Sequence, residues 1–148
     1  MSQTSIIIRP ATKNDATSIS ALLSELGYSL EVAQVRKNIA LLSSSSNDAV
    51  LVAEAALSVV GVISFHVIPL FHVVGNLGRI SSLVVSSQRQ RRGVGSKLVQ
   101  AAEDFGWSQG CLRIEVTSGD QREGAHEFYQ SLGYQLDERR FVKRPTPA

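Results

Sequence analysis

The chain has 148 residues, the length of one compact domain, and a formal net charge of +2, which is weak evidence for any charged partner. Its hydrophobic fraction of 43% and charged fraction of 19% are typical of a folded globular protein. The one cysteine, Cys111, excludes an internal disulfide and a cysteine-based zinc site, and no metal is expected. There is no run of about 18 apolar residues and no basic-then-apolar beginning, so a cytoplasmic location is the default expectation and no membrane partner is predicted.

The first third of the chain is predicted to form a strand followed by two helices. Ile6–Pro10 is a β-branched run that ends at a proline, which is typical of a short strand. Thr12–Asp15 has the pattern of a capping box, and the apolar residues of Ile19–Leu26 recur on one helical face before Gly27. A second, weaker helical pattern covers Val32–Leu42.

The middle third is rich in strand-forming residues. Ala49–Ala55 and Val59–Ile68 are predicted to be strands joined by a tight connection near Leu57–Ser58. After a turn cluster at Gly75–Gly78, a further strand is predicted over Arg79–Ser86. Its alternation fails because two adjacent serines precede three apolar residues. A β-bulge would explain this change of phase, and bulges are common beside active sites.

The last third is predicted to contain a helix, a strand, a second helix and a final β segment. The helix runs from Gly93 to near Gly110, the strand covers Leu112–Thr117, and the second helix covers Ala125–Leu132. Tyr134–Val142 is predicted to form one or two short strands. No linker or repeat interrupts the pattern, so residues 1–148 are predicted to form a single α+β domain, a three-layer arrangement of helices on a mixed sheet.

The glycine-rich turn Gln90–Ser96 stands between a predicted strand and a predicted helix, which is the order that makes an anion site. The first amides of a helix have no internal partners, and the helix macrodipole adds about half a positive charge there. The two glycines let a ligand approach the backbone without a Cβ in the way. Arg89, Arg91 and Arg92 are unfavourable at an empty helix N-terminus by about 0.3–1 kcal/mol each, which favours a multiply charged anion as the normal occupant.

The turn taken alone has a second interpretation, a solvated basic turn whose glycines serve packing only. It lacks the full GxGxxG pattern because position 98 is leucine, and it lacks the Gly-Lys-Ser/Thr of a P-loop. Nucleotide-binding folds are therefore weakly supported, and the surrounding sequence has to decide which anion is bound.

Two motifs taken together resemble the GNAT superfamily of N-acetyltransferases. Gln90–Gly95 (QRRGVG) is similar to the family's Q/R-x-x-G-x-G/A acetyl-CoA signature, and Ala125–Tyr134 (AHEFYQSLGY) is similar to its A-x-x-F-Y-x-x-x-G-F/Y segment. The resemblance covers most of the chain. It implies the GNAT-type acyl-CoA N-acyltransferase fold, with a mostly antiparallel sheet that splays at the strand before the glycine turn.

The resemblance also implies which residues bind acetyl-CoA, the expected co-substrate. The pyrophosphate would lie on the amides of the glycine turn, and backbone groups of the bulged strand would pair with the pantetheine arm. One amide near Leu83 would stabilise the oxyanion of the tetrahedral intermediate. Arg122 stands where many relatives have an asparagine, and is expected to reach the coenzyme A phosphates instead. The full set of expected cofactor-binding residues is Leu83, Val84, Val85, Gln90, Arg91, Arg92, Gly93, Val94, Gly95, Ser96, Arg122 and Phe128.

Tyr129 matches the family's usual general acid, which protonates the departing coenzyme A thiolate. The alternative is a core tyrosine, because Tyr129 shares a helical stripe with Ala125 and Phe128. The Phe-Tyr pair and the Leu-Gly-Tyr that follows favour the catalytic role.

The group that removes the proton from the acceptor amine is left open. Many relatives carry a carboxylate on the strand before the glycine turn, whereas the stretch Arg79–Leu83 has none. An alkyl ammonium has a pKa of about 10, so a proton must leave before the amine attacks. A water chain, Glu115, His66 and His72 are the candidates. No Ser/His/Asp grouping is apparent and Cys111 lies in a buried type of setting, so no covalent intermediate is expected.

The expected function is transfer of the acetyl group of acetyl-CoA to a primary amine by direct transfer in a ternary complex. The acceptor would be an amine-bearing small molecule or a peptide. The alternative is a non-catalytic acyl-CoA-binding or regulatory module of the same fold, which the missing strand carboxylate favours slightly. Nucleic acid is not an expected partner, because the aromatic residues are not interleaved with basic ones. Dimers are common among the relatives, and a homodimer is a further expectation.

Overall fold

The computed structural model describes residues 5–89, 93–117, 124–137 and 139–146, and the chain divides into two compact units, Met1–Thr117 and Ser118–Ala148. The described elements of the first unit are, in chain order, β1 (Ile6–Pro10), a 3₁₀ turn η1 (Lys13–Asp15), α1 (Ala16–Glu25), α2 (Val32–Ser43), β2 (Asp48–Ala55), β3 (Ser58–Pro69), β4 (Asn76–Val85), a second 3₁₀ turn η2 (Ser87–Arg89), α3 (Val94–Ser108) and β5 (Cys111–Val116). Within the described segments, no helix combines the length and the apolar character needed to cross a membrane.

The described strands of the first unit form one sheet in the order β1-β2-β3-β4-β5. The strands from β1 to β4 pair in antiparallel fashion, and β5 is parallel to β4. A parallel pair requires a crossover connection, which α3 supplies. The predicted α+β fold with a mixed, mostly antiparallel sheet is confirmed. The β4–β5 register ends at the pair Ile80↔Val116, and β4 continues beyond it to Val85.

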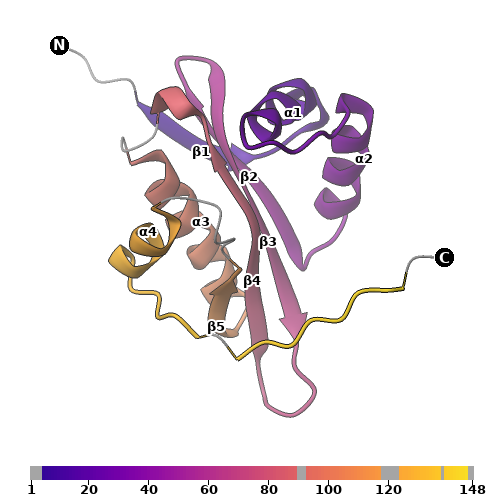
Figure 1. Ribbon diagram of the computed structural model, residues 1–148, viewed down its shortest axis with the longest axis vertical. Helices are drawn as coiled ribbons and strands as arrows, with labels where there is room; N and C mark the ends of the chain where they lie inside the picture. The colour runs from indigo at the N-terminus through magenta and orange to yellow at the C-terminus, as the bar shows by residue number, and fades with distance from the viewer. Residues whose placement is uncertain (1–4, 90–92, 118–123, 138, 147–148) are drawn as a thin grey trace. The chain divides into compact units, whose positions relative to one another are not determined.

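Helices cover both faces of this sheet, with α1 and α2 on one face and α3 on the other (Figure 1). β3 lies in the middle of the sheet and is buried continuously from Val60 to Phe65. Coverage on both faces explains why this strand has an apolar run rather than strict alternation. Val62 belongs to the core beneath α1 and α2, whereas Gly61 and Phe65 approach α3.

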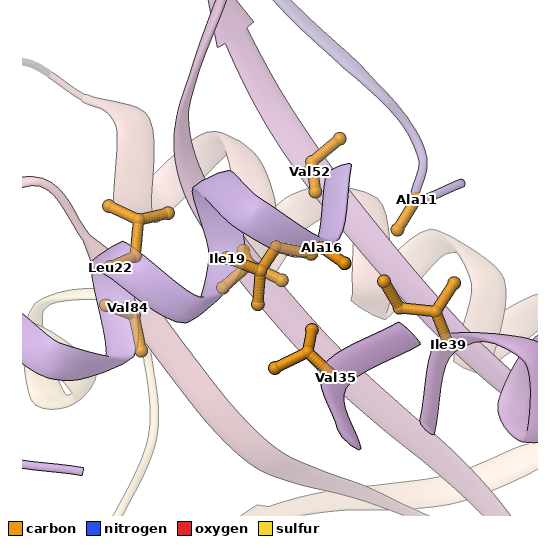
Figure 2. Packing of buried hydrophobic residues seen from close by; sticks show 9 residues of the cluster. Ala11, Ala16, Ile19, Leu22, Val35, Ile39, Val52 and Val84 are labelled. Atoms are coloured by element: carbon orange, nitrogen blue, oxygen red, sulfur yellow. The ribbon is translucent and has the colours of Figure 1, made fainter. Parts of the chain in front are cut away.

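The core between the sheet and the first two helices is built from small and branched side chains. Figure 2 shows Leu22 of α1, Val35 of α2 and Val84 of β4 among the side chains of one buried cluster. Val84 is only 1% exposed, so it belongs to this core. The buried members of the cluster are Ala11, Ala16, Ile19, Leu22, Val35, Ile39, Val52, Val62 and Val84.

Arg9 joins β1 to the turn that begins α1. Its guanidinium donates to both carboxylate oxygens of Asp15, at 2.8 and 2.9 Å, and to Glu54 on β2 at 3.1 Å. Asp15 also accepts the backbone N–H of Thr12 at 2.7 Å, which is one half of the predicted capping box. The hydrogen bond from Arg9 is the main reason that the pKa of Asp15 lies below its ordinary value, although burial opposes it.

Two predicted boundaries in this unit differ from the structure. The turn between β2 and β3 consists of Ala56 and Leu57, one residue earlier than predicted, and both have positive φ, as a two-residue type I′ turn requires. β4 begins at Asn76, so most of the predicted turn cluster is strand. A Cβ at Gly78 would lie 2.5 Å from Cζ of Phe65, so this glycine makes room for the aromatic ring and does not mark a turn.

The second unit contains one described helix, α4 (Ala125–Ser131). It follows Gly124 and is terminated by Gly133, whose φ of +96° is the left-handed conformation typical of a helix stop. The predicted strand at Tyr134–Val142 is wrong for the residues described there, 134–137 and 139–142, which have no regular secondary structure. A strand needs a partner with which to pair, and the described residues of this unit contain none.

Candidate active site

The predicted β-bulge in β4 is confirmed. Ser64 of β3 pairs with Ser82, but the next residue, Phe65, pairs with Ile80, so Ser81 is an extra residue on β4. A bulge changes the phase of the strand at this point. As a result, the hydroxyls of both Ser81 and Ser82 reach the same partner, Ser64 Oγ, at 2.6 and 2.7 Å.

The bulge completes a chain of side chains across three strands. Asp48 is the first residue of β2, and its Oδ1 lies 2.6 Å from Nδ1 of His66 on β3. Nε2 of the same ring lies 2.6 Å from Oγ of Ser81. The expectation of no Ser/His/Asp grouping is therefore wrong, because His66 lies within hydrogen-bond distance of both Asp48 and Ser81. Ser81 is exposed, His66 and Asp48 are partly buried, and Ser64 is buried.

The surroundings of Asp48 favour its ionised form. Burial by itself would raise the pKa of Asp48, but the hydrogen bonds with His66 and Ser45 and the charge of the imidazole outweigh it, and the pKa lies below its ordinary value. A carboxylate can only accept, so it fixes a proton on Nδ1 of the imidazole.

Of the named candidates for the proton acceptor, His66 is the one that the structure brings to the bulge. Glu115 on β5 is engaged by two arginines, Arg113 at 2.9 Å and Arg79 at 3.5 Å. His72 lies outside β3, in the exposed segment that leads to β4. Arg79 is the cross-strand partner of His66, and it also donates to Thr117 Oγ1 at 2.5 Å.

The glycine turn comes after β4 and η2 in the chain. After β4 and η2, the described chain resumes at Gly93, whose φ of +81° is left-handed, and α3 begins at Val94. The backbone bond from Lys97 N–H to the carbonyl of Gly93 opens the helical ladder at 3.1 Å, so the amides of residues 94–96 precede it. Ser96 uses its hydroxyl to donate to the same carbonyl at 3.1 Å, within the first turn of the helix.

Close packing on β3 fixes the start of α3. A Cβ at Gly61 would lie 2.9 Å from Cδ1 of Leu98 and 3.1 Å from Cγ1 of Val94. Val94 is 1% exposed, so its side chain packs in the core, and its role in cofactor binding stays a prediction. Gln90, Arg91 and Arg92 lie outside the described residues.

The second unit holds the other predicted residues. The rings of Phe128 and Tyr129 meet edge to face with centroids 5.1 Å apart, and Tyr129 meets Tyr134 in the same way at 5.7 Å. The N–H of Tyr134 donates to the carbonyl of Tyr129 at 3.0 Å, which fixes the end of α4. Arg122 lies outside the described residues. The general-acid role of Tyr129 stays a prediction.

Sequence reasoning missed Asp48 and Ser81 as members of the site. His66 was one of several candidates, and the adjacent serines were noted only as a sign of a bulge. The signal that was available is the combination of both, because a bulge at the serines changes which of their hydroxyls faces the histidine. Cys111, by contrast, was interpreted correctly: it is 8% exposed, and burial raises the pKa of its thiol.

Comparison with known proteins bears on the family and the fold of the chain. The model of the Acetyltransferase (GNAT) family matches residues 19–134. An aminoalkylphosphonate N-acetyltransferase of Salmonella typhimurium is 31% identical over 137 residues, which cover 92% of this chain and 89% of that protein.

Solved structures are similar over almost the whole chain. An aminoglycoside N-acetyltransferase in complex with CoA superposes with a TM-score of 0.85 at 18% identity and covers 97% of both chains. The glucosamine-6-phosphate N-acetyltransferase of Arabidopsis thaliana has a TM-score of 0.81 at 20% identity, over 95% of this chain and 98% of its own. At these identities the structures establish the fold, while the family model and the curated relative establish the kinship: the chain belongs to the acetyltransferase (GNAT) family.

Proposed function

We propose that this protein transfers the acetyl group of acetyl-CoA to a primary amine, by direct attack of the amine in a ternary complex, and that residues 1–148 act as one catalytic domain. The observation that carries the proposal is the family match over residues 19–134 together with a curated N-acetyltransferase 31% identical over 92% of the chain. The related structure in complex with CoA supports the choice of donor.

The start of α3 is the proposed site for the pyrophosphate. The helix begins at a glycine in the left-handed conformation, and among the described residues beyond its chain neighbours a Cβ there would have only Ser96 Oγ within 4 Å, at 3.9 Å. Backbone amides at the beginning of a helix with 15 residues, reinforced by the macrodipole, favour a bound anion. The amides of Val94, Gly95 and Ser96 are the described part of this site, and Gln90, Arg91 and Arg92 complete it in the proposal.

The end of β4 is the proposed site for the thioester. Leu83, Val84 and Val85 follow the bulge and extend beyond the register with β5, so this part of β4 is where a pantetheine arm would pair as an added strand. In the proposal an amide near Leu83 stabilises the oxyanion. Tyr129 then protonates the thiolate as the bond between carbon and sulfur breaks, with Phe128 packed against its ring.

For the acceptor, we propose a small primary amine that carries an anionic group, with aminoalkylphosphonates as the first class to test. The support is the name and the extent of the relative from Salmonella typhimurium, which covers nearly the full length of both chains. Aminoglycosides are a less supported class, because the related aminoglycoside enzyme is only 18% identical.

The experiment is an acceptor screen that follows release of free thiol from acetyl-CoA. Aminoalkylphosphonates, aminoglycosides, polyamines and amine-bearing peptides form the panel, and each matching compound without its amine is the control. The buried thiol of Cys111 keeps the background reaction with the thiol reagent low. Binding of acetyl-CoA without turnover of any amine would instead support the non-catalytic acyl-CoA-binding module.

A further inference from the structure

The hydrogen-bond chain at the bulge has only one consistent direction when its imidazole is neutral. The Asp48 carboxylate can only accept, so Nδ1 of His66 carries the ring proton and donates at 2.6 Å. Nε2 is then an acceptor, and the hydroxyl of Ser81 must donate to it across 2.6 Å. The single hydroxyl proton of Ser81 is thereby used.

The remaining hydroxyls follow from that choice. With its proton committed to the imidazole, Ser81 Oγ can only accept from Ser64 at 2.6 Å, and Ser64 Oγ in turn accepts from Ser82 at 2.7 Å. A hydroxyl oxygen has two acceptor positions, so Ser81 Oγ keeps one for a donor that is not part of this series of hydrogen bonds. Ser81 is exposed, whereas Ser64 is 9% exposed.

Ser81 also lies on β4 close to the proposed position of the thioester. It is the extra residue of the bulge and precedes Leu83, where the proposed function places the thioester. An ammonium group that approaches the acetyl carbon must release a proton, and its N–H donors match the open acceptor position of this hydroxyl. β4 carries no carboxylate along Asn76–Val85 that would take the proton instead.

We propose that Ser81, His66 and Asp48 form a proton relay that deprotonates the acceptor amine, and this inference rests on the proposed function. Ser81 touches the substrate, His66 receives the proton through it, and Asp48 is a positioning residue that holds the reactive tautomer. The relay takes the place of the strand carboxylate that the chain lacks.

The step balances as follows. The ammonium gives a proton to Ser81 Oγ as the hydroxyl proton moves to Nε2 of His66, which leaves a neutral amine and an imidazolium beside the Asp48 carboxylate. The amine forms a bond to the acetyl carbon, the bond to sulfur breaks, and Tyr129 gives its proton to the thiolate in the proposed role. The second proton of the attacking nitrogen then replaces the phenolic proton, so the products are the neutral amide and the neutral coenzyme A thiol. The imidazolium returns its proton to solvent before the next cycle.

Within the described part of the chain, the charged groups around His66 are few. Asp48 lies on one side, on β2, and Arg79 on the other, on β4, where Glu115 of β5 neutralises it at 3.5 Å. The one titratable residue of α1, Glu25, is engaged with Ser87 at 3.1 Å. α2 packs on β2 and carries the exposed cations Arg36 and Lys37. α3 covers the opposite face of the sheet.

The test measures kcat/KM against pH for wild type and His66→Gln, with an acceptor amine of pKa about 10. Wild type is expected to reach a plateau well below the pKa of the amine, because the relay accepts its proton. His66→Gln is expected to rise with unit slope up to that pKa, to lie about 10²–10⁴-fold below wild type near neutral pH, and to converge with it at high pH. His72→Gln, the same change at an exposed position of the same chain, is the matched control and is expected to follow wild type.

Two further variants test the relay without relying on the His66→Gln substitution. Ser81→Ala and Asp48→Asn are each expected to lower the plateau and to converge with wild type at high pH, while the Kd of acetyl-CoA stays unchanged. Partial recovery of the plateau in Asp48→Glu is expected, because a carboxylate again faces Nδ1. A destabilised variant would instead lose activity by the same factor at every pH.

Nitrogen-15 NMR of the imidazole separates a failure of the relay from a failure of the proposed function. Wild type is expected to hold the proton of neutral His66 on Nδ1, and Asp48→Asn to shift it toward Nε2. If no amine is acetylated at all, the proposed function fails, whereas a wrong tautomer overturns the hydrogen-bond direction of the relay even when acetylation occurs. The relay is overturned by a proton on Nε2 in wild type, by a His66→Gln profile parallel to that of wild type, or by an acetyl group on Ser81 after incubation with acetyl-CoA alone.

Discussion

His66 on β3 and Ser81 on β4 meet across a β-bulge, with Nε2 and Oγ 2.6 Å apart. In the register of these strands, Arg79 is opposite the histidine and Ser82 is opposite Ser64, so β4 has two residues where β3 has only Phe65. Ser81 is the extra residue of the bulge, and its hydroxyl faces the imidazole. The proposed proton relay thus depends on a local irregularity of the backbone, and the first two turns of α3 and the core beneath α1 hold the strands that carry it.

The thiolate-protonating role of Tyr129 predicts a split between kcat and affinity. Tyr129→Phe removes the phenolic proton but keeps the ring that packs against Phe128 and Tyr134. We expect kcat to fall by about 10²–10⁴-fold and the Kd of acetyl-CoA to stay within about twofold of wild type. Tyr28→Phe makes the same chemical change in the first unit and is expected to leave kcat unaltered. An unchanged kcat in Tyr129→Phe would remove this residue from the mechanism.

The glycine at the start of α3 predicts a loss of donor affinity. Gly93→Ala introduces a Cβ at a φ of +81°, which costs about 1–2 kcal/mol of stability and places a methyl group beside the proposed pyrophosphate site. Gly27→Ala is the matched control, because Gly27 has a φ of +89° and open space around it. Both variants are expected to melt at lower temperature, and only Gly93→Ala is expected to weaken binding of acetyl-CoA in calorimetry. Equal Kd values for the two variants would place the pyrophosphate elsewhere.

The space around Phe65 predicts a strong packing defect. A Cβ at Gly78 would lie 2.5 Å from Cζ of Phe65, and one at Gly106 would lie 2.7 Å from the same atom. Gly78→Ala is therefore expected to lower the free energy of unfolding by about 1–3 kcal/mol or more in urea denaturation. The double variant Gly78→Ala, Phe65→Leu removes the atom that clashes and is expected to recover part of the loss. No difference between the single and the double variant would mean that the strain lies elsewhere.

The ion pair of Arg9 and Asp15 predicts a pH-dependent contribution to stability. The folded-state pKa of Asp15 is depressed, so its contribution is complete above the unfolded-state pKa of about 3.9 and is lost as the pH falls through the folded-state value. Asp15→Asn is expected to cost about 1.5–3 kcal/mol at pH 7, because two hydrogen bonds to a buried charge lose their acceptor charge.

The comparison variant for that pair is Glu54→Gln. Glu54 accepts from the same guanidinium at 3.1 Å and has a more exposed side chain, so a smaller loss is expected. The difference in unfolding free energy between wild type and Asp15→Asn should shrink below pH 4. A difference that stays constant down to pH 2 would contradict the assigned pKa shift.

Periodicity in the sequence predicted the helices, the strands and the bulge of the first unit, because each of these is determined by local pattern. Apolar spacing identified α1 and α3, and the two adjacent serines marked the change of phase in β4. Local pattern failed to predict the structure where contacts with residues far away in the sequence determine it. Gly78 resembles a turn residue but lies in a strand, where it is a glycine because Phe65 leaves no room for a Cβ. The described residues after Gly133 are of strand-forming types, but no described strand of their unit is available to pair with them.

The same distinction applies to the site. The glycine turn and the Phe128–Tyr129 pair could be identified because the family motif keeps their chemistry at short range. The relay could not, because Asp48, His66 and Ser81 come from three strands, and only the register of the sheet shows that they are neighbours. A histidine and a serine 15 residues apart carry no pattern until the bulge between them is placed.

The most direct measurement of the central claim is the stoichiometry of acetyl transfer by the purified protein. Acetyl-CoA is incubated with the amine selected by the screen, and free thiol and acetylated product are quantified together. We expect equal amounts of both, dependent on the protein and on the amine, with the acetyl group on the nitrogen. Thiol release without an N-acetylated product, or no turnover with any amine while acetyl-CoA binds, would contradict it.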